Sequence, residues 1–173
     1  FKSFRTLDVN TGQLSEPIWD MSLEAAAAKD GLVVFDYGSG SEFNNLLDMT
    51  YDPSSDLLYT SEAYQKDANT DAVTILYTID KTTGKLHKAN VIEDQIQYFC
   101  FDIDGNMWAI SPYWKETGKD EKGNPVFTFS GNYLTEYDSN FEPVDGMRFV
   151  LKDQYKNNIF ATSYGSMSFN HST

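Results

Sequence analysis

Cysteine and basic residues are scarce in this chain of 173 residues. Cys100 is the only cysteine, which excludes an intrachain disulfide and a zinc site built on several thiolates. We expect its thiol to be buried, because it lies in the apolar run Tyr-Phe-Cys-Phe at residues 98–101. Lysine and arginine number 13 against 26 aspartate and glutamate residues, which gives a formal net charge of −13. This charge argues against nucleic acid and anionic lipid as partners, because both would be repelled.

Histidine and long apolar runs are also lacking. His87 and His171 are the only histidines, they lie far apart in the sequence, and no serine stands in a G-x-S-x-G pattern. The glycine-rich residues 38–41 lack the spacing of a phosphate-binding loop. No stretch approaches the roughly 20 apolar residues of a transmembrane helix, so no membrane insertion is expected. The sequence therefore predicts no catalytic residue, no metal site and no cofactor.

One carboxylate-rich segment, residues 102–106, has the start of a calcium-binding loop. The twelfth position of such a loop carries a bidentate glutamate, and here that position is Tyr113. We therefore expect Asp102 to accept hydrogen bonds from the backbone of a tight turn. Asp52 and Asn170 occupy the corresponding place in the repeats described next, which suggests the same structural role for them.

Aromatic residues are abundant, with 3 Trp, 11 Tyr and 12 Phe, which is too many for a disordered acidic chain. The chain also repeats itself. Residues 48–64 and 98–113 share an aromatic residue followed by Asp, a polar turn, a short apolar run and a later tyrosine. Apolar runs at residues 74–80 and 133–138 continue the two copies. Short runs of this kind, bounded by Asp, Asn, Gly and Pro, predict four-stranded antiparallel meanders that must stack to bury a core.

These units resemble the blades of bacterial β-propeller repeat proteins of the YncE-like type. The resemblance rests on Tyr51-Asp52 with Leu58-Tyr59, on FDIDGNMW at residues 101–108 and on LYTIDKTTGKL at residues 76–86. It implies an all-β propeller fold in an extracytoplasmic protein, and it brings no catalytic residue. The predicted divisions are the end of a blade (1–20), a helical insertion with a connecting strand (21–45), two blades (46–92 and 94–150) and the start of a further blade (151–173).

A partial array of blades is expected, because propellers close with four to eight blades. Closure would then need further blades from the same protein or from another chain. Residues 22–29, S-L-E-A-A-A-A-K, predict one short helical insertion by propensity. Residues 114–125 are charged and contain two glycines, which predicts a long exposed hairpin between the second and third strands of the later blade.

Tyr64, Tyr113 and Trp114 are the candidate ligand-binding residues. The two tyrosines follow Tyr59 and Trp108 by five positions each, so their loops are expected on the same face of the propeller. Aromatic side chains beside Asp, Glu and Asn suit carbohydrates, peptides or cationic groups. The alternative is that the tyrosines cap the core. Trp108 is expected inside the core and Trp114 outside it.

The sequence thus favours a non-catalytic binding or interaction module of a secreted or surface-attached protein, with a carbohydrate or protein ligand. One alternative is an enzyme, lactonase-like or active on glycans, whose site needs blades beyond this chain. A purely structural spacer is the third alternative. Buried loop aromatics would favour the spacer.

Overall fold

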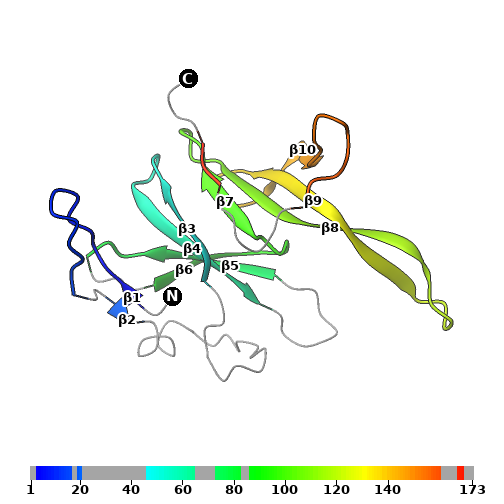
Figure 1. Ribbon diagram of the computed structural model, residues 1–173, viewed down its shortest axis with the longest axis horizontal. Coiled ribbons are helices and arrows are strands. Elements are labelled where there is room, and N and C mark those ends of the chain that lie inside the picture. Colours follow the sequence, from blue (N-terminus) through cyan, green and yellow to red (C-terminus); the bar gives the residue numbers. More distant parts are fainter. Residues whose placement is uncertain are drawn as a thin grey trace.

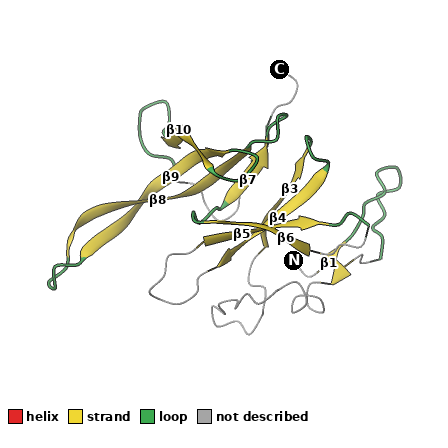
Figure 2. Cartoon of the chain, turned by 180° about the vertical axis from the view of Figure 1, so that it is seen from behind, coloured by secondary structure: helices red, strands yellow, loops and turns green. Residues whose placement is uncertain are grey.

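The computed structural model describes residues 3–16, 19–20, 46–64, 73–82, 86–160 and 167–169. All regular structure in these residues is β-strand (Figures 1 and 2). The helix expected at residues 22–29 lies outside the described residues. The described residues form no helix that is long and apolar enough to cross a membrane.

Two four-stranded antiparallel sheets make up most of the fold (Figure 1). In both sheets each strand pairs with the next one along the chain, which confirms the predicted antiparallel meanders. Strands β1 and β2, of two residues each, pair with each other in a separate antiparallel ribbon. The strands are β1 (Ser3–Phe4), β2 (Trp19–Asp20), β3 (Leu46–Asp52), β4 (Leu57–Tyr64), β5 (Val73–Ile79), β6 (Leu86–Ile92), β7 (Tyr98–Phe101), β8 (Met107–Lys119), β9 (Pro125–Tyr137) and β10 (Pro143–Val150).

The hydrophobic core lies between the first sheet (β3–β6) and the second sheet (β7–β10). Side chains that alternate along the strands of both sheets meet there, as expected for half-buried strands. Burial of each large side chain contributes about 1.5–3 kcal/mol. The cluster comprises Tyr59, Leu76, Ile92, Ile96, Phe99, Phe101, Met107, Ala109 and Tyr137, with Phe141 packed against it.

One aromatic contact of the core has a counterpart on the outer face of the second sheet. Tyr59 on β4 packs against Phe101 on β7, with 4.8 Å between the ring centroids. Trp108 holds the matching position on β8, and its ring packs against Phe169 at 5.9 Å. The expectation that Trp108 belongs to the core is wrong, because Met107 and Ala109 face the core and alternation turns Trp108 the other way.

Aspartate side chains organise four turns of the same design. Each carboxylate accepts hydrogen bonds from the backbone N–H groups two and four residues later, at 3.0 and 2.9 Å in the case of Asp102. The prediction that Asp102 accepts hydrogen bonds from the backbone of a tight turn is therefore confirmed. The four aspartates are Asp102, Asp120, Asp138 and Asp153, and the positive-φ residues three positions later are Gly105, Gly123, Phe141 and Lys156.

Asp52 bonds the β3–β4 turn, as the repeat predicts. Its Oδ1 accepts hydrogen bonds from the backbone N–H and the hydroxyl of Ser54, at 2.9 and 2.8 Å, and its Oδ2 accepts one from the hydroxyl of Ser55. Burial by itself would raise the pKa of this carboxyl group. The hydrogen bonds from Ser55 and Ser54 outweigh burial and lower the pKa below its ordinary value of 3.8. Asn170, the third residue with this predicted role, lies outside the described part of the chain.

This lowered pKa makes stability depend on pH. A carboxyl group whose pKa is lower in the folded state stabilises the fold above its unfolded pKa, and this contribution is lost as the pH falls through the folded pKa. We therefore expect the free energy of unfolding to decrease as the pH is lowered from about 5 to below 3, and to decrease less in Asp52→Asn. Urea unfolding at several pH values measures this effect. The control is Asp145→Asn, which removes an exposed carboxylate, and equal pH slopes in the two variants would contradict the prediction.

Candidate functional site

The three predicted ligand-binding aromatics have different surroundings. Tyr64 is the last residue of β4, and its side chain lies outside what the structure describes. Tyr113 is half-buried and packs against Tyr133, with 4.8 Å between ring centroids. Trp114 is 55% exposed, which confirms its predicted place outside the core. Of the two whose side chains are described, Trp114 is the more exposed and thus the one that is open to a ligand.

Trp114 lies on a two-stranded arm that extends away from both sheets (Figures 1 and 2). We define the arm as residues 114–129. Its strands are the outer parts of β8 and β9, which pair with each other beyond the last residues that pair with β7 and β10. The turn around Asp120 closes its tip, with hydrogen bonds of 2.8 Å from the N–H groups of Lys122 and Asn124. The predicted exposed hairpin is thus confirmed, with longer strands and a shorter turn than the sequence suggested.

The arm and a residue beyond β10 together form an aromatic surface. It is made of Trp114, Phe127 and Phe129 of the arm and of Phe160. Trp114 and Phe129 are paired across the strands, and Phe127 is two residues from Phe129, so the three share one face. The Phe129 ring lies 5.4 Å from Trp114 and 5.4 Å from Phe160, centroid to centroid. Trp114, Phe127 and Phe160 are each 55% exposed. The alternation of Phe127 and Phe129 is a signal that the sequence reading could have used.

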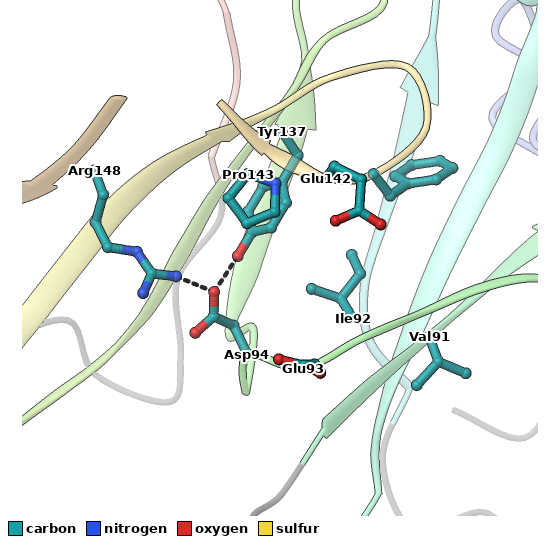
Figure 3. A pocket seen from close by; sticks show the side chains of 9 residues that line it. Val91, Ile92, Glu93, Asp94, Tyr137, Glu142, Pro143 and Arg148 are labelled. Carbon is teal, nitrogen blue, oxygen red and sulfur yellow. Dashed lines mark hydrogen bonds and ion pairs between the residues drawn. The ribbon is translucent and has the colours of Figure 1, made fainter. Parts of the chain in front are cut away.

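A cavity of about 300 Å³ lies at the other end of β9 (Figure 3). The link from β6 to β7 forms one side of it, and the turn from β9 to β10 with the start of β10 forms the other. Its lining mixes apolar side chains with three carboxylates and one arginine. The lining residues are Val91, Ile92, Glu93, Asp94, Tyr137, Phe141, Glu142, Pro143 and Arg148.

Asp94 is the centre of the hydrogen bonds in this cavity. Its Oδ2 accepts a 2.5 Å hydrogen bond from the Tyr137 hydroxyl and pairs with the Arg148 guanidinium (Figure 3). The backbone carbonyl of Asp94 accepts a 2.8 Å bond from the hydroxyl of Thr74 on β5. Burial raises the pKa of Tyr137, and the bond to Asp94 raises it further, so the phenol remains a hydrogen-bond donor. The sequence analysis did not identify this cluster.

A second buried carboxylate lies in the first sheet. Glu62 on β4 is 1% exposed, and its Oε2 accepts a 3.0 Å hydrogen bond from the hydroxyl of Tyr77 on β5. Burial raises the pKa of Tyr77, and the charge of Glu62 adds to this effect. The Tyr77 hydroxyl therefore stays protonated and donates its hydrogen bond to the buried carboxylate. The pair is a structural contact within the sheet.

Known proteins give no guide to the chemistry of these features. Comparison with models of known families, with curated proteins and with solved structures found no match. Across the described ranges, no three His, Cys, Asp or Glu side chains are grouped so that they could hold a metal ion. An interpretation of function therefore depends on the aromatic surface and on the cavity.

Proposed function

We propose that the two sheets are consecutive blades of a β-propeller and that the chain acts as a non-catalytic binding module. The repeated ring contact supports the blade assignment. Tyr59 on β4, the second strand of the first sheet, packs against Phe101 on β7, the first strand of the second sheet. Trp108 on β8, the second strand of the second sheet, packs in the same way against Phe169, which follows β10 in the chain. Strands β3 and β7, the first strand of each sheet, also lie side by side, as the inner strands of neighbouring blades do.

The observation that carries the binding role is the aromatic surface of the arm. Three large rings that are each more than half exposed lie on one surface, two of them on the arm and the third, Phe160, beyond β10, and such a grouping is unusual for side chains that only stabilise a fold. The rings do not form a flat platform, because Trp114 and Phe129 are inclined by 54° and Phe129 and Phe160 by 75°. Inclined rings suit the side chains of an apolar peptide better than the flat face of a sugar. The proposed ligand is therefore a protein segment with apolar side chains.

The proposal predicts that a change at the arm weakens peptide binding without unfolding the protein. Peptides selected from a phage-displayed random library on the whole chain are the probe. We expect Trp114→Ala to weaken the selected peptides by at least about tenfold, because aromatic anchors dominate most interfaces. Tyr155→Ala, which removes a ring that is 76% exposed outside the arm, should leave binding unchanged. Equal weakening by the two substitutions would refute a role for the arm, and selective retention of glycans on an array would make the ligand a carbohydrate.

A further inference from the structure

We propose that the cavity beside Asp94 binds an ammonium group at the end of an aliphatic chain, as in a lysine side chain. This site is made by the β6–β7 link and the β9–β10 turn, and it shares no residue with the aromatic surface of the arm. The inference therefore goes beyond the proposed peptide-binding role, and either can fail without the other.

Arg148, the cation in the cavity lining, is already engaged by other groups of the protein. Its guanidinium pairs with Asp94, and its Nε donates a 3.0 Å hydrogen bond to the hydroxyl of Thr135. The guanidinium also lies over the ring of Tyr133, at 5.2 Å from the ring centroid. An anionic ligand would have to displace Asp94 from this arrangement. The cavity is therefore poorly suited to phosphate, sulfate or a carboxylate ligand.

Glu93 and Glu142 are solvent-exposed residues that also line the cavity. They come from the two opposite sides of the cavity, and Figure 3 shows the carboxylate of Glu142 at its upper side and that of Glu93 at its lower side. No described residue forms a hydrogen bond or ion pair with either carboxylate. A cation placed between two carboxylates is attracted by both of them. The net charge of −13 on the chain also attracts cations.

The walls of the cavity are suited to the methylene chain behind such a cation. Ile92, which is 4% exposed, lines the cavity together with Phe141 and Pro143. Long amphipathic chains bury their methylene groups on such surfaces while the charged end reaches polar groups. A volume of about 300 Å³ accommodates one side chain or one small amine.

NMR titration of the whole chain tests this site. The probes are Nα-acetyl-lysine N-methylamide, its Nε-acetylated form, which keeps the chain but loses the charge, and n-pentylamine. We expect the charged lysine derivative to shift the backbone amides of residues 91–94 and 141–148, and the acetylated form to leave them unchanged. The double variant Glu93→Gln/Glu142→Gln should raise the Kd of the lysine derivative by about tenfold or more, because it removes two charge-assisted contacts.

The matched control is Glu16→Gln/Glu121→Gln, which removes the same charge from two exposed positions away from the cavity. This variant should bind as the unmodified chain does. Equal binding of the acetylated probe, or an equal loss in the control variant, would overturn the proposal. Tighter binding of the lysine derivative than of n-pentylamine would assign the site to a lysine of a protein partner. Equal affinities would assign it to free amines of the same chemistry.

Discussion

Gly105→Ala is expected to destabilise the protein by about 2–5 kcal/mol. Gly105 has a φ of +88°, a conformation that costs residues with a Cβ energy. A Cβ added there would lie 2.2 Å from the Oγ and 3.0 Å from the Cβ of Ser54 in the β3–β4 turn. Ser54 cannot rotate away without losing its 2.8 Å hydrogen bond to Asp52. The substitution therefore disturbs the contact between the two turns as well as the backbone.

Gly123→Ala separates these two causes. Gly123 holds the same place in the turn around Asp120, with a φ of +86°, and nothing lies within 4 Å of its Cβ position. We expect this variant to lose only the backbone contribution, about 1–2 kcal/mol. Urea unfolding of both variants measures the difference, and Gly105→Ala combined with Ser54→Gly should recover part of the loss. If both alanine variants lose equal stability, the turn-to-turn contact contributes nothing.

Phe101→Ala is expected to cost about 3–5 kcal/mol, because it leaves a cavity between the two sheets. The Phe101 side chain is 2% exposed. Its ring centroid lies 4.8 Å from that of Tyr59, 6.1 Å from Phe99 and 6.4 Å from Phe141. Removal of this ring opens the centre of the core, where both sheets contribute side chains and neither can close the gap alone.

Phe127→Ala is the matched control for the core substitution. Phe127 is 55% exposed on the arm, so its removal should change the free energy of unfolding by no more than about 0.5 kcal/mol. Chemical denaturation with a fixed protein concentration compares the two variants. A loss at Phe127 as large as that at Phe101 would mean that the arm is folded against the body in solution.

The sequence was sufficient for the local features of the fold. Apolar runs bounded by Asp, Gly and Asn predicted the four-stranded meanders, because strand alternation and turn formation depend on neighbouring residues. The sequence also predicted that Asp102 accepts hydrogen bonds from the backbone of a tight turn, because Asp, Gly and Asn stand close together there. The turn around Asp153 has the same hydrogen bonds but places Lys156 where Gly is usual, so its pattern was not recognised.

The candidate sites were predicted less completely. Trp114 was identified as an exposed aromatic, but Phe160 joins the same surface from a segment 46 positions later in the chain. The equivalence between Tyr59 and Trp108 was found in the sequence, and yet Trp108 was assigned to the core. Tyr59 faces the second sheet, whereas Trp108 faces residues 167–169, so the burial of this position depends on what packs against it and not on the residue type.

The sequence by itself determined that the chain forms antiparallel strands, where several of its turns lie and that it is strongly acidic. Each of these properties follows from residues close together in the chain or from a simple count. Only the tertiary structure decided that Asp94 meets Tyr137 and Arg148, and that Glu93 and Glu142 face one cavity. These residues lie 43 to 54 positions apart, and their meeting depends on how the two sheets stack. No local pattern encodes that arrangement, because the hydrophobic contacts that drive the stacking are non-directional and act over the whole interface.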